Sequence, residues 1–146
     1  MKTIPVKKFT PKARKPEGFD EQWRPVRVLV VDDEEIVRKL VSQVLRSAGY
    51  EIAGEAGDGR RAVEMYRMLH PAIVTLDVEM PFMDGYAALE MILKQDPKAV
   101  VVMLTNQMEK HTVAKIIKAG ARDYIVKPID RLLILSKLRK IRGIKD

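Results

Sequence analysis

Three carboxylates, a hydroxyl and an ammonium stand at the ends of apolar runs in this sequence, and together they could bind a metal ion and a phosphate. They are Asp32, Asp33, Asp77, Thr105 and Lys127. Apolar runs rich in β-branched residues predict buried strands. Because ligands of open α/β sheets bind outside the carboxyl ends of the strands, we expect these five side chains to converge on one rim of a sheet.

The chemistry of such a rim follows from its charges. Three neighbouring carboxylates repel one another, so at least one resists ionisation unless a cation binds. Oxygen donors without nearby His or Cys favour Mg²⁺ or Mn²⁺ over Zn²⁺. Lys127 can neutralise an anionic oxygen, and the Thr105 hydroxyl can donate to another. Because a carboxylate can act as a nucleophile toward phosphorus, we predict Asp77 as a phosphate acceptor, beside a loop fixed by the Met80–Pro81 turn.

The elements that position these residues alternate regularly after residue 25. Strands are predicted at residues 26–31, 51–56, 72–77, 99–104 and 122–126. Helices are predicted at residues 34–48 and near residues 109–119, as the first and fourth. The second, third and fifth are predicted to start at Asp58, Asp84 and Asp130; the second stops before Pro71, the third ends at about residue 95, and the fifth continues through Ile141. Five strand–helix units, each crossover long enough for a right-handed helix, predict a single doubly wound α/β domain with a five-stranded parallel sheet.

Apolar stripes predict which helix faces pack on the sheet. For the first helix the predicted stripe comprises Ile36, Val37, Leu40, Val41, Val44, Leu45 and Ala48. For the last helix it comprises Leu132, Leu133, Leu135, Leu138 and Ile141. Gly49 is suited to end the first helix.

The charge and composition of the 146-residue chain limit the classes of function. Residues 1–25 carry seven Lys/Arg and three acidic residues, +4 of the net charge of +7, so we predict a flexible basic extension at 1–24 and a domain at 25–146. Because the basic excess lies mainly in the extension, we predict no DNA-binding domain. The longest apolar run, residues 99–104, is far shorter than the roughly 18 residues of a membrane span, and the lack of cysteine excludes disulfides. These features favour a cytoplasmic protein.

Four motifs give the chain a specific resemblance. They are VLVVDDE (28–34), TLDVEMPFMDGYAAL (75–89), VVMLT (101–105) and AGARDYIVKPI (119–129). In order and spacing they resemble the receiver domain of two-component response regulators, in the stand-alone CheY-like form. The resemblance covers residues 26 to about 142 and implies the flavodoxin/CheY-like strand order 2-1-3-4-5.

The resemblance also implies roles at the acidic rim. Asp77 would accept a phosphoryl group from a histidine kinase or a phosphotransfer protein. Asp33 would bind Mg²⁺ directly and Asp32 mostly through water, with Asp77 itself and the backbone carbonyl of Glu79 completing the protein ligands.

A second group of implied residues concerns the switch between two states. Lys127 would pair with the phosphate, and the Lys127–Pro128 peptide bond would be cis. Thr105 would move toward the phosphoryl group while Tyr124 turns inward. This would remodel the surface formed by the fourth helix, the fifth strand and the fifth helix.

Three positions beside the rim depart from the usual family pattern or tune its rates. Asn106 stands where the family usually has a small residue. Glu79 and Gln107 occupy the two positions at which the family adjusts self-dephosphorylation. We predict that Glu79 changes the lifetime of the phosphorylated state by placing negative charge near the attacking water.

The resulting functional hypothesis is a phosphorylation-controlled binding protein in chemotaxis or motility, with a downstream protein target such as a flagellar switch. It would not be an enzyme beyond self-phosphorylation from small donors and self-dephosphorylation. A phosphorelay intermediate that passes its phosphoryl group onward is the alternative. The rival of another class is a phosphatase with an aspartate nucleophile. That chemistry needs an Asp two places after the nucleophile, where this chain has Glu79.

Overall fold

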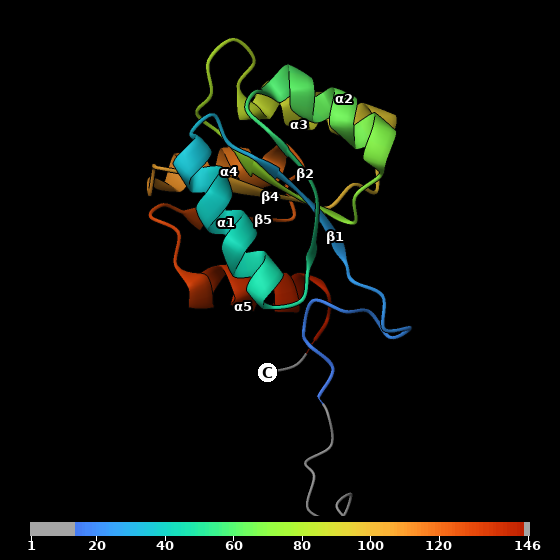
Figure 1. Cartoon of the computed structure of the whole chain (residues 1–146). Helices are drawn as coiled ribbons and strands as arrows, with labels where there is room; N and C mark the ends of the chain where they lie inside the picture. Colours follow the sequence, from blue (N-terminus) through green and yellow to red (C-terminus); the bar gives the residue numbers. More distant parts are fainter. Residues whose placement is uncertain (1–13, 145–146) are drawn as a thin grey trace, which may run out of the picture.

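The computed structural model describes residues 14–144, which form a parallel sheet between two layers of helices (Figure 1). The strands are β1 (Arg27–Val31), β2 (Glu51–Ala56), β3 (Ile73–Asp77), β4 (Val101–Thr105) and β5 (Asp123–Val126). The helices are α1 (Glu35–Ser47), α2 (Gly59–Leu69), α3 (Gly85–Gln95), α4 (Lys110–Lys118) and α5 (Arg131–Ile141). All pairings are parallel, in the order β2-β1-β3-β4-β5, which confirms the predicted fold and strand order.

Successive strand residues point to opposite faces of the sheet, so each strand contributes to two cores. Leu76 and Met103 pack in the core that α2, α3 and α4 cover. Val30 and Leu104 pack in the core beneath α1 and α5. With both faces covered, the strands must be apolar along their whole length, so that polar residues are left for their ends.

Local sequence signals set the helix boundaries. Asp58, Asp84 and Asp130 each accept a hydrogen bond from a backbone N–H in the first turn of α2, α3 and α5, which confirms the predicted helix starts. Gly49 follows α1 with φ +97°, a conformation that favours glycine.

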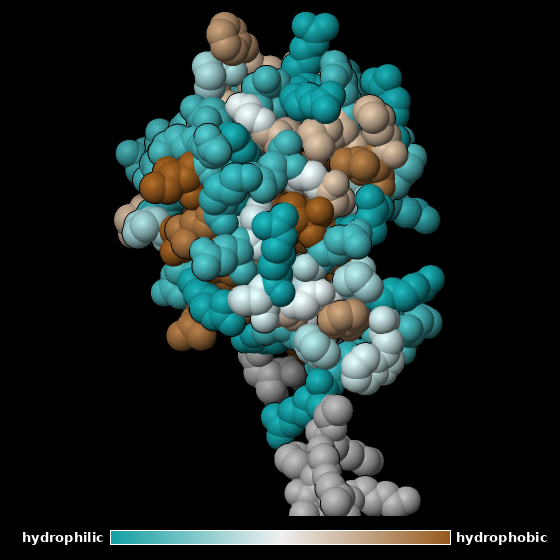
Figure 2. Space-filling view, in the orientation of Figure 1, coloured by the Kyte–Doolittle hydropathy of each residue, from teal (hydrophilic) through white to brown (hydrophobic). Residues whose placement is uncertain are grey.

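Both predicted apolar stripes were too wide. Ile36 in α1 and Leu132 in α5 are 77% and 76% exposed, and Leu40 and Leu133 are exposed as well. At about 100° per residue these positions lie on the flanks of the stripes, beyond the sector that contacts the sheet. Ile134, which the prediction omitted, is fully buried. The face of the molecule that Figure 2 shows is mostly hydrophilic, with small, separate apolar groups.

The predicted extension at residues 1–24 falls partly outside the described residues. Residues 16–25, which include the described end of this extension, form a turn that packs at the amino end of the sheet, and we call this turn the N-terminal clasp. Gly18 N–H donates to the carbonyl of Ala48 at 2.8 Å, and Gly18 carbonyl accepts from Val26 N–H at 2.7 Å. The predicted domain boundary at residue 24 stays a prediction. Within residues 14–144, no helix has the length and apolar character needed to cross a membrane.

Candidate functional site

The carboxyl ends of β1, β3, β4 and β5 bring the predicted site residues to one rim. Asp77 is the last residue of β3 and Thr105 the last of β4, whereas Asp32 and Lys127 directly follow β1 and β5. Carboxylate oxygens of Asp32, Asp33 and Asp77 all lie within 4.8 Å of one another. The parallel register therefore gathers groups that are far apart in the sequence, as predicted.

A buried ammonium holds two of the three carboxylates together. Lys127 Nζ lies 2.8 Å from Asp32 Oδ2 and 3.2 Å from Asp77 Oδ1, and the Lys127 side chain is only 10% exposed. The other carboxylate oxygen of Asp32 accepts a hydrogen bond from Glu34 N–H at 2.9 Å. Asp33 is exposed and supplies the solvent side of the cluster. The Lys127–Pro128 peptide bond is cis, as the resemblance implies.

The protonation of the cluster reflects its excess of negative charge. Burial, followed by the charge of Asp32, raises the pKa of Asp77 to about 7, although the Lys127 ammonium acts in the opposite direction. Burial acts to lower the pKa of Lys127, but the carboxylates of Asp32 and Asp77 outweigh it and raise that pKa. One ammonium does not balance three carboxylates, so the site favours an additional cation.

The donor set fits a hard divalent cation. Asp32, Asp33 and Asp77 offer only oxygen atoms, and the backbone carbonyl of Glu79 follows on the same loop. Oxygen donors of this kind suit Mg²⁺ or Mn²⁺, and an exposed carboxylate leaves room for the waters that Mg²⁺ keeps.

The loop after β3 is held close to Asp77 by a glycine. Gly85 N–H donates to the carbonyl of Val78 at 2.9 Å, and Asp84 caps α3 by accepting from Ala87 N–H at 2.9 Å. A Cβ on Gly85 would lie 2.2 Å from the carbonyl oxygen of Asp77. The close approach of the α3 start to the strand end thus requires glycine here.

The tip of the same loop projects into solvent. Met80 is buried against the core, whereas Pro81 is exposed and Phe82 is fully exposed. Phe82 also has φ +67°, a strained conformation for a bulky residue.

The switch candidates lie on β4 and β5. Thr105 is buried, and its hydroxyl donates to Glu79 Oε1 at 2.9 Å while accepting from Gln107 N–H at 3.0 Å. Asn106 N–H donates to Glu79 Oε2 at 3.4 Å. Tyr124 is half-buried, with the ammonium of Lys137 4.8 Å from its ring centre.

Sequence reasoning did not find the contact between Glu79 and Thr105. It placed the Glu79 charge near an attacking water and assigned no hydrogen bond to the side chain. The sequence indicates only that Glu79 follows one strand and that Thr105 ends the neighbouring one. This limits the distance between the two residues but does not orient the glutamate side chain.

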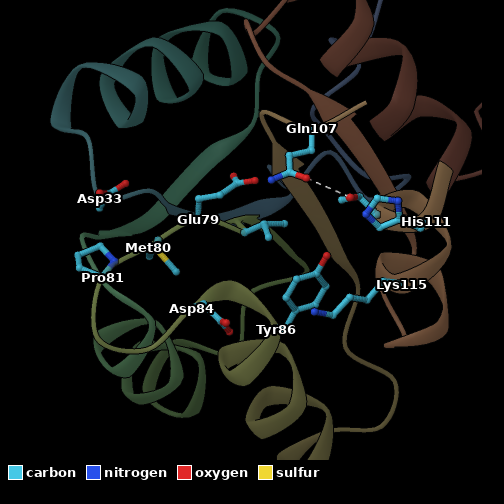
Figure 3. Close-up of a pocket in the computed structure, with 11 residues that line it drawn as sticks. Asp33, Glu79, Met80, Pro81, Asp84, Tyr86, Gln107, His111 and Lys115 are labelled. Carbon is cyan, nitrogen blue, oxygen red and sulfur yellow. Dashed lines mark hydrogen bonds between the residues drawn. The ribbon is translucent and has the colours of Figure 1, made fainter. Parts of the chain in front are cut away.

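A cavity of about 600 Å³ opens beside the acidic rim, between the β3–α3 loop and α4 (Figure 3). Its lining includes Asp33, Glu79, Tyr86, Gln107, His111 and Lys115. The Lys115 ammonium lies 4.2 Å from the centre of the Tyr86 ring. His111, to which sequence reasoning gave no role, is exposed and lies 3.0 Å from the Glu109 carboxylate. Because Asp33 belongs to the lining, the cavity reaches the acidic rim.

Comparisons with known proteins agree with the geometry. The family model described as response regulator receiver domain matches residues 28–139. The chemotaxis protein CheY of Thermotoga maritima is 44% identical over 115 residues, which are 79% of this chain and 96% of the relative. CheY of Treponema pallidum is 43% identical over 130 residues, 88% of this chain and 90% of the relative. The crystal structure of the CheX–CheY–BeF₃–Mg²⁺ complex from Borrelia burgdorferi superposes with a TM-score of 0.86 at 35% identity, covering 90% of this chain and 100% of that chain.

Proposed function

Because the chain belongs to the receiver-domain family of response regulators, we propose that it is a CheY-like signalling protein that accepts a phosphoryl group on Asp77. The observation that carries the proposal is the cluster of three carboxylates within 4.8 Å of one another, with Lys127 Nζ 3.2 Å from Asp77. A structural ion pair or a helix cap does not need a third carboxylate, here that of Asp33, beside the two that contact Lys127.

The chemistry assigns a separate task to each group at the rim. A carboxylate oxygen of Asp77 attacks the phosphorus of a phosphohistidine, and the P–N bond breaks as the imidazole nitrogen takes the electron pair. Asp32, Asp33, Asp77 and the Glu79 carbonyl would hold Mg²⁺, which when bound supplies positive charge to the phosphoryl oxygens. Lys127 neutralises a further oxygen from its buried position.

The output is a change of surface rather than turnover of a substrate. A phosphoryl group on Asp77 carries up to about two negative charges in place of the single charge of the carboxylate, and it brings new acceptor oxygens to the rim. Thr105 responds at the end of β4 and Tyr124 on β5, so the face of α4, β5 and α5 changes its preferred conformation. We therefore propose a non-catalytic protein whose reactions are limited to its own phosphorylation and dephosphorylation.

The partners follow from the same premise. A histidine kinase or phosphotransfer protein supplies the phosphoryl group, and a cytoplasmic protein target, such as a flagellar switch, reads the altered face. Chemotaxis proteins among the relatives favour motility signalling over a phosphorelay. Capture of a flagellar switch protein only by the phosphorylated form would support motility, and rapid transfer from Asp77 to a phosphotransfer histidine would support a relay instead.

Three residues at the mouth of the rim are proposed to set the rates. Glu79 and Gln107 line the cavity beside the phosphorylation site, where a water attacking the phosphoryl group would enter, and Asn106 N–H donates to Glu79 Oε2 at 3.4 Å. We expect Glu79→Asn to change the decay rate of the phosphorylated protein, because it removes a negative charge beside that water. An unchanged rate of phosphate release would exclude this role.

The decisive experiment is Mg²⁺-dependent labelling with acetyl phosphate. Wild type should gain one phosphoryl group, seen by intact mass spectrometry, and Asp77→Asn should gain none. Asp58→Asn is the matched control, because Asn is an equally good helix cap and Asp58 lies outside the rim. Labelling of Asp77→Asn at the wild-type level would refute the proposed function.

A further inference from the structure

The side chain of Glu79 occupies a site built for an anion. Its two carboxylate oxygens accept the Thr105 hydroxyl at 2.9 Å and the Asn106 backbone N–H at 3.4 Å. Among the described residues no Lys, Arg or His forms an ion pair with Glu79. Figure 3 shows its carboxylate extended across the mouth of the rim toward the Gln107 loop. Neutral donors at the end of β4 therefore hold the Glu79 carboxylate.

Those donors are the ones that a phosphoryl group on Asp77 would require. Asp77 and Thr105 end neighbouring parallel strands, with Asp77 paired in register with Leu104. A phosphoryl oxygen and a carboxylate oxygen are both anionic acceptors and compete for the same kind of donor. A hydroxyl has a single proton, and the Thr105 oxygen already accepts from Gln107 N–H. Thr105 can consequently donate either to Glu79 or to a phosphoryl oxygen.

We propose that Glu79 is an internal competitor of the phosphoryl group, which must displace its carboxylate from Thr105 and Asn106 before the switch can close. This inference rests on the proposed function and adds a regulatory residue to the same site. In the unphosphorylated protein Glu79 holds Thr105 in the inactive arrangement. Phosphorylation expels the carboxylate toward the cavity, where solvent can receive its charge. The residue thus raises the threshold for activation.

Beryllofluoride with Mg²⁺ serves as the probe, because it binds as an analogue of the phosphoryl group without chemical turnover. We expect Glu79→Ala to bind it about tenfold more tightly than wild type, which corresponds to about 1.4 kcal/mol. Glu79→Gln, which keeps an acceptor but loses the charge, should lie between the two. Glu109→Ala removes an exposed acid at the start of α4 that does not contact Thr105, and it should bind as wild type does.

A double-mutant cycle separates competition for the hydroxyl from simple charge repulsion. In a Thr105→Ala background, Glu79→Ala should raise the affinity for beryllofluoride by less than about twofold, because no hydroxyl remains to be released. An equal gain in both backgrounds would overturn the proposal and leave repulsion as the cause. The affinities can be measured by calorimetry or by ¹⁹F NMR of the bound fluorides.

A second readout needs neither metal nor phosphoryl analogue. The amide proton of Asn106 should move upfield in Glu79→Ala, since its acceptor is lost, and should not move in Glu109→Ala. An unmoved Asn106 resonance, or wild-type beryllofluoride affinity in Glu79→Ala, would overturn the inference while the proposed function stands. If wild type neither binds beryllofluoride nor is labelled at Asp77, the proposed function fails and this inference fails with it.

Discussion

The two ends of the sheet use charged residues in opposite ways. At the carboxyl rim three carboxylates cluster, but the single ammonium of Lys127 contacts only Asp32 and Asp77, and the pKa of Asp77 is raised to about 7. At the amino end, Glu17 in the N-terminal clasp faces Arg139 of α5 at 3.2 Å, so one acid meets one base. The rim concentrates uncompensated charge, whereas the clasp pairs it.

The two ends of the sheet also differ in how their hydrogen-bonding groups are paired. Arg142 donates to the carbonyls of Glu17 and Phe19 and to the Tyr50 hydroxyl, so the clasp acceptors are paired by the end of α5. At the rim, the hydroxyl of Thr105 is held by a residue that we propose must leave. Clustered like charges lower stability but suit the rim to binding a cation, whereas paired hydrogen-bonding groups at the clasp stabilise the fold. Substitutions at the two ends should therefore differ in which property they change.

The largest effect is expected at the glycine beneath the rim. Gly85→Ala would place a Cβ 2.2 Å from the Asp77 carbonyl oxygen and 2.8 Å from Val78 Cα, and neither backbone atom can move without shifting β3. We expect a loss of about 3 kcal/mol in the free energy of unfolding, measured in urea, with loss of labelling by acetyl phosphate. Gly57→Ala is the control, because its Cβ would meet only the flexible end of Arg38 at 3.4 Å. A Gly85→Ala protein as stable as Gly57→Ala would show that this packing is dispensable.

Substitutions at the clasp should change the free energy of unfolding but not the labelling of Asp77. Arg142→Ala leaves the carbonyls of Glu17 and Phe19 without their donor and should lower the free energy of unfolding by about 2 kcal/mol. The rate of labelling on Asp77 should stay at the wild-type value, because the clasp lies at the opposite end of the sheet. Lys140→Ala, an exposed neighbour in α5, should change stability by less than about 0.5 kcal/mol. A change in labelling with Arg142→Ala would mean that the two ends are coupled.

The raised pKa of Asp77 predicts a pH dependence that belongs to the rim. Because the folded state holds this proton more tightly than the unfolded chain does, stability should fall as pH rises from about 4 through about 7. Solvent reaches the cluster through the exposed Asp33 and weakens the effect of charge. We therefore expect the free energy of unfolding to fall by about 1 kcal/mol over this pH range in metal-free buffer. In Asp77→Asn the free energy of unfolding should lack this dependence on pH. In wild type, Mg²⁺ should reverse the dependence by stabilising the ionised carboxylate. Identical urea-unfolding profiles for wild type and Asp77→Asn between pH 5 and 8 would contradict the raised pKa.

The smallest effect is expected at the loop tip. Phe82→Asn replaces a fully exposed side chain with φ +67° by a residue that tolerates this conformation better. We expect the free energy of unfolding to rise by about 0.5 kcal/mol. This should appear as a higher urea midpoint, with an unchanged dependence of the free energy on urea concentration. Pro81→Ala, at the neighbouring exposed position, should give no comparable gain. A loss of stability in Phe82→Asn would show that the aromatic side chain makes a stabilising contact.

Much of this architecture was predictable because its signals are local. Alternating apolar runs predicted the strands and crossovers, and Asp58, Asp84 and Asp130 predicted three helix starts that the structure confirms. The rim was predictable for a geometric reason, since residues at the ends of parallel strands must meet at one edge of the sheet. The roles of Asp77, Thr105 and the other rim residues stay predictions until the labelling experiment is done.

The order of the elements, the doubly wound sheet and the set of side chains at its carboxyl edge were predictable from sequence alone, because they depend on hydrophobic periodicity and on the order of residues along the chain. Three other features became visible only in the folded protein: the Glu79 carboxylate accepts from Thr105, Arg142 donates to the N-terminal clasp, and Ile36 is exposed. These outcomes depend on side-chain rotamers and on contacts between segments distant along the chain. No local pattern specifies them, because each is chosen by the packing of its neighbours.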